Sequence, residues 1–212
     1  MSAPQSYYVP VDAGEAEFTE KRSRFLGHVR RVETEAEARA FLDEMRKKYY
    51  DARHNCWCYV LHEGGVVRYG DDGEPQGTAG QPMLNVLQRE GVENVVCVVT
   101  RYFGGVLLGA GGLTRAYAKS AKDALDAAGK ARMRLWSAVT VDCPYPMLER
   151  LKLLAAAHSG TVEGTDFGAA VSVRILLPQE NAAGFDAALT ELSAGTMTAR
   201  REGERFLPGP RE

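Results

Sequence analysis

Residues 95–113 read VVCVVTRYFGGVLLGAGGL, and this stretch decides how the first half of the chain folds. The run Val95–Thr100 is apolar without interruption, which is typical of a strand buried on both faces of a sheet. Glycines then recur from Gly104 to Gly112, and a helical pattern follows from about Thr114 to Ala128. The stretch therefore predicts a strand, a glycine-rich turn and a helix.

The residues before this stretch alternate between strand and helix patterns. Thr34 and Glu37 match a capping box, so a helix is expected over Glu35–Tyr49. The first dozen residues show no period and are expected to form a loose arm. The other expected elements are strands within Phe18–Val32, with a polar break at Glu20–Ser23, strands at Asn55–Leu61 and Val66–Tyr69, and a helix at Gln81–Glu90.

The residues after this stretch have the order βαββαβ, which is the split-βαβ or ferredoxin-like pattern. We therefore predict an α+β protein with domains at residues 1–132 and 133–212, and a boundary near Arg132–Trp136. The expected elements are strands at Leu135–Val141, Thr161–Asp166, Ala169–Leu177 and Thr196–Phe206, and helices at Pro146–Ala157 and Glu180–Ser193.

Composition limits the classes of function. The chain has 212 residues, of which 45% are apolar and 25% charged, as in ordinary globular proteins. Because no apolar run approaches the roughly 18–20 residues that cross a bilayer, and the N-terminus lacks a signal-peptide pattern, we expect a cytosolic protein with no membrane segment. The four cysteines form no CxxC pair and no zinc-ligand spacing, so we predict reduced thiols and neither a metal nor a cofactor.

Charge is nearly balanced in both halves. There are 17 basic and 18 acidic residues before Arg132, and 9 and 10 from that residue onward. Neither half is a strongly basic module, which weakens a general phosphate-backbone function but leaves a local basic patch open.

The first candidate site is the loop DDGEPQGTAG, residues 71–80. Asp71, Asp72 and Glu74 offer carboxylates for a divalent cation or a general base, although Asp-Asp-Gly is also ordinary turn chemistry. The small residues that follow, including Gly77 and Thr78, lead into a helix start. Exposed backbone N–H groups there would form an anion seat.

The second candidate site is the glycine-rich turn after the buried strand. Arg101 and Arg115 would place two guanidinium groups around a phosphate or carboxylate, with the backbone opened by glycine. A solvated basic face is the alternative, with Lys119 and Lys122 balanced by nearby aspartates. The spacing is neither a P-loop nor a dinucleotide fingerprint. The ligand-binding candidates in this turn and helix are Arg101, Tyr102, Gly104, Gly105, Gly112 and Arg115.

His54 lies at the entry to an expected strand, where site residues often occur. Beside a carboxylate it would serve as an acid–base group, and a hydrogen-bonded structural histidine is an equal alternative. No nucleophile elbow or Cys/His pair supports covalent hydrolase chemistry.

Several of these motifs together resemble the IMPACT/YigZ family. The resemblance runs in order over roughly residues 15–130, and the βαββαβ remainder is similar to the second domain of the bacterial branch. The matching segments are Lys21–Phe25, His54–Cys56, Asp72–Pro75, Gly77–Pro82, Arg101–Gly105 and Leu107–Leu113.

The resemblance implies a fold and a role in translation. The first domain would share the α+β fold of a ribosomal small-subunit protein and of elongation factor G domain IV, and the second would be ferredoxin-like. Eukaryotic members act in translational control by binding the activator of a stress-responsive kinase. Those members carry an additional N-terminal interaction domain that is not expected in this chain, so that partner is not carried over.

Three functions remain open at this point. The protein could be a translation-associated regulatory or binding protein that contacts RNA or a ribosome-associated factor. It could be an enzyme or small-molecule binder that uses the two loops. The loops could also pack together as a structural junction, with Arg101 bridging Asp72 or Glu74.

Overall fold

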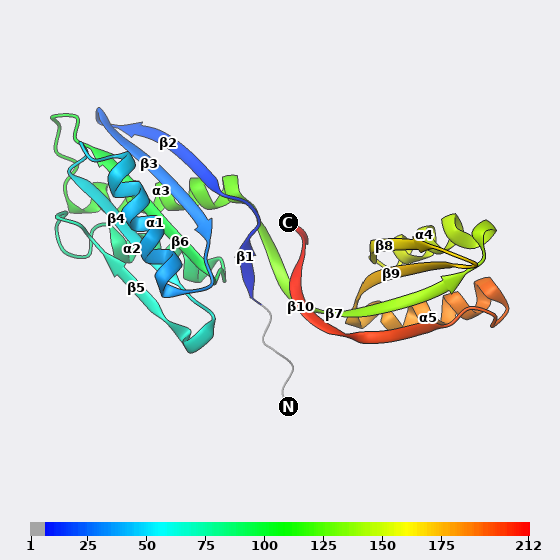
Figure 1. Cartoon of the computed structure of the whole chain (residues 1–212). Coiled ribbons are helices and arrows are strands. Elements are labelled where there is room, and N and C mark those ends of the chain that lie inside the picture. Colours follow the sequence, from blue (N-terminus) through cyan, green and yellow to red (C-terminus); the bar gives the residue numbers. More distant parts are fainter. Residues whose placement is uncertain (1–6) are drawn as a thin grey trace. The chain divides into compact units, whose positions relative to one another are not determined.

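The computed structural model describes residues 7–212 and divides into two compact units (Figure 1). The first unit takes the chain up to Arg132 together with Pro208–Glu212, and the second is Met133–Leu207. Strands and helices are mixed in both units, so the expected α+β class is confirmed. None of the described helices is long and apolar enough to span a membrane.

The first unit is built on an antiparallel sheet with the strand order β2–β3–β6–β4–β5. β6 lies in the middle, and every residue from Val95 to Arg101 is buried, which confirms the prediction of a strand covered on both faces. The strands are β2 (Gly14–Glu20), β3 (Ser23–Arg31), β4 (His54–Val60), β5 (Val67–Gly70) and β6 (Val95–Tyr102), with a 3₁₀ turn, η1 (Glu63–Gly65), before β5.

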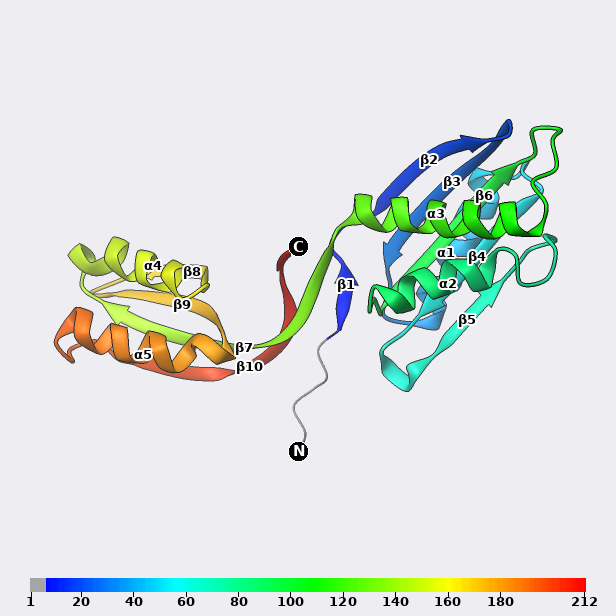
Figure 2. The same cartoon turned by 180° about the vertical axis from the view of Figure 1, so that it is seen from behind.

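Helices cover both faces of this sheet (Figures 1 and 2). α1 (Glu35–Lys48) packs on one face against Val96 and Val98, and its predicted capping box at Thr34 is present. α2 (Gly80–Arg89) and α3 (Ala110–Ala128) pack on the other face against Val95, Cys97 and Val99. Side chains alternate along a strand, so β6 contributes to two separate cores.

The second unit contains the expected succession βαββαβ. Its sheet has the order β10–β7–β9–β8, and its core includes Leu151, Phe185 and Leu189. The elements are β7 (Lys130–Cys143), the 3₁₀ turn η2 (Tyr145–Met147), α4 (Leu148–Ala157), β8 (Thr161–Phe167), β9 (Val171–Pro178), α5 (Gln179–Ser193) and β10 (Ala199–Arg211).

The expectation of a loose N-terminal arm is wrong for the residues that follow residue 6. Strand β1 (Tyr8–Pro10) pairs with Lys130–Arg132 at the start of β7, and Val9 is fully buried. Three residues are too few to show a period, and their partner is remote in sequence, so no local pattern could reveal the pairing. Residues 1–6 of the expected arm lie outside the described residues.

Candidate functional site

Arg101 and Glu74 form a buried ion pair at the end of β6. Nη1 of Arg101 donates to Oε1 of Glu74 at 2.7 Å, and the two side chains are only 6% and 4% exposed. The Tyr117 hydroxyl donates to the same carboxylate oxygen at 2.7 Å, and Arg101 Nη2 lies 3.4 Å from Ser23 Oγ. Of the two bridges considered from the sequence, the one between Arg101 and Glu74 is present.

The buried groups around this pair are held in their neutral forms. Burial is the main cause that raises the pKa of the Tyr117 hydroxyl, and the nearby Cys56 and Glu74 raise it further. Burial likewise raises the pKa of the Cys56 thiol, which donates to the Asp71 carbonyl at 3.0 Å. A thiol with a raised pKa is a poor nucleophile, so Cys56 is a structural group.

The carboxylate of Asp71 occupies the anion seat that the sequence indicated. It accepts backbone N–H bonds from Gly77 at 2.8 Å, Ala79 at 3.0 Å and Gly80 at 2.8 Å, at the start of α2. The Thr78 hydroxyl donates to the Pro75 carbonyl at 2.7 Å. The donors expected to hold a ligand at Gly77 and Thr78 are therefore already bonded within the chain.

Asp72 is hydrogen-bonded to the start of β4 through its carboxylate and through its backbone carbonyl. Asp72 Oδ2 accepts the N–H of Asn55 at 2.7 Å, and the Asp72 carbonyl lies 2.9 Å from Nδ1 of His54. Because a carbonyl only accepts, Nδ1 carries a proton and donates to it, which leaves Nε2 for another partner. Asp71, Asp72 and Glu74 thus have separate partners, and among the described residues no three His, Cys, Asp or Glu are arranged to hold a metal ion.

Gly104 packs against the hairpin turn that joins β2 and β3. A Cβ at Gly104 would lie 2.0 Å from the carbonyl carbon of Arg22, and its N–H donates to Ser23 Oγ at 3.2 Å. The turn itself is Lys21-Arg22, with φ values of 46° and 66°. Both residues occupy the left-handed region, where a two-residue hairpin usually has Asn-Gly. Gly104 therefore has a structural role, and the neighbouring Gly105 has a φ of 84°.

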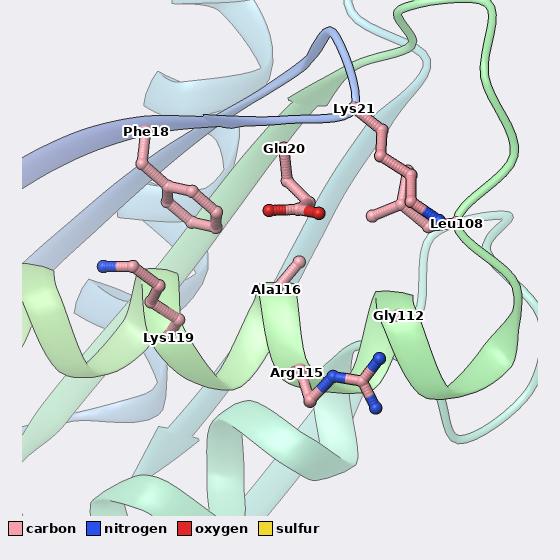
Figure 3. A pocket seen from close by; sticks show the side chains of 8 residues that line it. All are labelled: Phe18, Glu20, Lys21, Leu108, Gly112, Arg115, Ala116 and Lys119. Atoms are coloured by element: carbon pink, nitrogen blue, oxygen red, sulfur yellow. The ribbon is translucent and has the colours of Figure 1, made fainter.

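Two cavities lie on either side of Leu108, which lines both. One, of about 170 Å³, lies between β2 and α3 and includes Lys21, Gly112, Arg115 and Lys119 in its wall. Figure 3 shows the Glu20 carboxylate pointing into it. The other, of about 340 Å³, is lined by Glu74 and Arg101 and is called here the Glu74 cavity. Arg101 and Arg115 line different cavities, so the structure does not bring these two arginines together around one anion.

The charged side chains near the two cavities fall into two groups, those that form ion pairs and those that do not. Arg24 pairs with Glu17, Lys119 with Asp123 and Lys122 with Asp126, so the solvated alternative holds for the two lysines. The Tyr102 hydroxyl donates to Asp51 at 2.7 Å, and burial together with Asp51 raises the pKa of Tyr102 to about 12. In the described part of the chain, no ion pair involves Lys21, Arg22, Arg53 or Arg115.

Sequence reasoning missed four residues of this region: Ser23, Arg53, Asp71 as a capping group, and Tyr117. The helical spacing of Tyr117, Ala121, Leu125 and Ala128 predicts an apolar stripe on this helix, and all four residues are buried. Nothing in that pattern indicates that the hydroxyl reaches Glu74. For Asp71, the only available signal was its place in the acidic triplet.

Comparisons with known proteins agree with this two-unit α+β architecture. Residues 21–125 match the Impact N-terminal domain, and residues 141–196 match a domain of unknown function, DUF1949. The IMPACT family member YvyE of Bacillus subtilis is 36% identical over 94% of this chain and 92% of its own length. YigZ of Escherichia coli is 36% identical over 84% of this chain and 88% of its own.

A solved structure, described as the crystal structure of a hypothetical protein, is also similar. It is 33% identical and has a TM-score of 0.58, and the match covers 92% of this chain and 96% of that one. The chain belongs to the IMPACT family.

Proposed function

We propose that this protein is a translation-associated binding protein that contacts RNA through one edge of its first unit. This RNA-binding edge comprises the Lys21-Arg22 turn, Arg53, the loop Phe103–Gly109 and Arg115. The observation that carries the proposal is a set of four cations that form no ion pair with any described acidic residue. Arg53 lines one cavity with the exposed Phe103, Lys21 and Arg115 line the other, and Arg22 lies against Gly104. Family membership supports the link to translation, through the translational role of the eukaryotic members.

The chemistry of the edge suits RNA in a single-stranded region. Unpaired Lys and Arg side chains neutralise phosphates, and an exposed aromatic ring offers a stacking surface for a base. Phe103 is 48% exposed, and Leu107 in the same loop is 82% exposed. A local cluster on a chain of net charge −2 predicts modest affinity that depends on salt.

Two finer fold assignments belong to the same proposal. The order β10–β7–β9–β8 with antiparallel pairing of β9 supports a ferredoxin-like second unit. The first unit has α1 on one face of its sheet and α2 and α3 on the other. This arrangement supports a relation to the ribosomal-protein and elongation-factor fold. Fold likeness by itself does not transfer a function, so the RNA proposal rests on the basic edge.

The Lys21→Asn/Arg22→Gly variant tests the RNA-binding edge. Asn-Gly is the favoured pair for this hairpin turn, so the variant removes two charges without straining the backbone. We expect it to weaken binding of a single-stranded RNA in fluorescence anisotropy, and to reduce the slope of log affinity against log salt by about 1.4, at about 0.7 per lost phosphate contact.

The matched control is Arg39→Ala/Arg89→Ala, which removes two charges from the opposite end of the sheet. Arg39 is in the first part of α1 and Arg89 ends α2. The control should bind RNA as the wild type does. Equal losses in both variants, or no RNA binding by the wild type even at low salt, would rule out the proposed edge.

A further inference from the structure

The Glu74 cavity has apolar walls and a few polar groups at its base. Pro75, Phe103, Leu107 and Leu113 are among its apolar lining residues. Its volume of about 340 Å³ lies at the lower end of the roughly 300–1,000 Å³ of small-molecule pockets. A cavity of this size suits a ligand no larger than a single nucleotide.

Two hydrogen-bonding positions on the buried ion pair are unused. Nε of Arg101 is buried and has no partner among the described residues, and Arg101 lines this cavity. Glu74 uses Oε1 for both Arg101 and Tyr117, while within residues 7–212 Oε2 has no hydrogen bond. A buried donor without a partner is costly, so an unused donor and an unused acceptor on the same ion pair indicate a polar ligand.

The start of α3 adds an uncapped helix N-terminus at the same cavity. Gly109 and Ala110 line the cavity, and the helix has no side-chain cap and no acidic residue in its first turn. The other two helices of the first unit have internal caps, from Thr34 on α1 and from Asp71 on α2. Arg53, which is free of ion pairs in the described chain, also lines the cavity.

We propose that the Glu74 cavity binds one nucleotide unit that carries a terminal phosphate. The phosphate lies at the first turn of α3 beside Arg53, where the backbone N–H groups and the guanidinium neutralise it. The base lies against Phe103 and Pro75, and its polar edge faces Glu74 Oε2 and His54. The ligand is either a free nucleoside monophosphate or the phosphorylated end of an RNA, and the second source rests on the proposed RNA-binding function.

The smaller cavity between β2 and α3 is a weaker choice for the same ligand. The Glu20 carboxylate points into it (Figure 3), and Lys119 in its wall is already paired with Asp123. A carboxylate in a space of about 170 Å³ repels a phosphate, whereas the one carboxylate that the described residues bring to the Glu74 cavity is paired with Arg101.

The test compares Ala110→Asp with Ala110→Asn in the full chain. Ala110 is exposed, lines the cavity and opens the helix, and both replacements are well tolerated at a helix start. The two variants have nearly the same shape and differ in charge. Calorimetric titration with the four nucleoside 5′-monophosphates, the matching nucleosides and inorganic phosphate measures the contribution of each part.

We expect at least one monophosphate to bind about tenfold or more tightly than its nucleoside, since a charge-assisted hydrogen bond is worth about that factor. Ala110→Asp should abolish this preference and Ala110→Asn should keep most of it. Monophosphates that bind no better than nucleosides, or a preference that survives Ala110→Asp, would overturn the inference.

RNA oligonucleotides with a 5′-phosphate or a 5′-hydroxyl separate the two sources. A preference for the phosphorylated end that Ala110→Asp removes identifies the RNA end as a ligand. RNA binding that depends on Lys21 and Arg22, with no effect of a phosphate in either form, refutes the cavity proposal and leaves the RNA-binding edge in place. Binding of monophosphates without any RNA binding supports the cavity proposal and refutes the RNA-binding edge.

Discussion

The buried pair of Arg101 and Glu74 and its two hydrogen-bond partners come from separate parts of the first unit: Ser23 bonds to Arg101, and Tyr117 bonds to Glu74. Glu74 comes from the loop before α2, Tyr117 from α3 and Ser23 from the start of β3. All three interactions are buried, so water cannot replace a partner that is removed. This junction holds the glycine-rich loop and the acidic loop together, and it forms the base of the Glu74 cavity.

Removing one member of the ion pair should destabilise the protein strongly. Arg101→Met leaves the Glu74 carboxylate buried without its cation, and we expect the free energy of unfolding to fall by about 3–5 kcal/mol. Adding Glu74→Gln to this variant should cost much less than the two single changes summed, because the buried charge is then gone. Urea denaturation measures all three variants, and simple additivity would contradict a coupled pair.

The control for this cycle is an exposed ion pair. Arg24 and Glu17 are about half exposed, with side-chain values of 52% and 48%. Arg24→Met should change stability far less than Arg101→Met does, because solvent screens exposed pairs.

His28 should make stability depend on pH. Its side chain is 4% exposed and faces Glu15 and Lys48, and Nε2 has no hydrogen bond within the described chain. Burial is the main cause that lowers the pKa of His28 below 6.5; Glu15 opposes the shift, while Lys48 and Arg30 add to it. The unfolded chain therefore takes up a proton first, so stability is full above about pH 6.5 and is lost as the pH falls through the folded pKa.

His28→Gln should flatten this acid-side loss of stability. The measurement is urea unfolding of both proteins between about pH 5 and 7.5, which brackets the unfolded pKa of histidine. A histidine resonance that titrates above 6.5 in the folded wild type would show that Glu15, and not burial, dominates.

At the scale of elements, α3 packs unusually close to the strands below it. A Cβ at Gly27 of β3 would lie 2.5 Å from the backbone oxygen of Ser120, and one at Gly14 of β2 would lie 2.0 Å from that of Ala124. These contacts are with helix backbone, which cannot move aside without displacing the helix. α3 also contributes Tyr117 and part of the wall of the Glu74 cavity. The distance between α3 and the sheet therefore affects the geometry of the site.

Gly27→Ala should push α3 outward. We expect a loss of about 1–3 kcal/mol in unfolding free energy from overpacking, with weaker hydrogen-exchange protection across α3. Gly111→Ala is the matched control, because its Cβ would have only Arg115 Nη1 within contact, at 3.5 Å, and alanine favours a helix. A Gly27→Ala variant as stable as the control would mean that α3 is not held by this close contact.

Most elements were predictable because their signals are local. The capping box at Thr34, the apolar run of β6 and the buried stripe of α3 each depend on residues within one element, and each is present. β1 was missed because three residues carry no period, and β7 begins at Lys130, before the expected Leu135, because its first residues pair with β1. Pairing between distant strands adds order that no local pattern contains.

At the scale of the whole molecule, each unit has a hydrophobic core of its own. Met83 and Tyr117 belong to a core of the first unit, and Phe185 and Leu189 to that of the second. β7 and β10 contribute residues to both units, since the division falls after Arg132 and again before Pro208. Separate cores imply that each unit can lose its packing by itself.

A cavity in one core should therefore leave the other protected. Phe185 is fully buried, and Phe185→Ala should cost about 3–5 kcal/mol within the second unit. Hydrogen exchange followed by mass spectrometry should show faster exchange in β9 and α5, with β6 unchanged. Met83→Ala should produce the reverse pattern. Faster exchange in both units after either change would mean that they unfold together.

The sequence by itself determined the family, the α+β class, the order of elements and the motif loops, because each depends on near neighbours or on a specific run of residues. Only the tertiary structure decided how those motif residues are used. It pairs Arg101 with Glu74, and it bonds the Asp71 carboxylate to backbone N–H groups at the start of α2. It also places Arg115 in the wall of another cavity. The physical reason is that these partners come from different elements, and their meeting depends on strand register and helix depth, which many distant contacts set jointly.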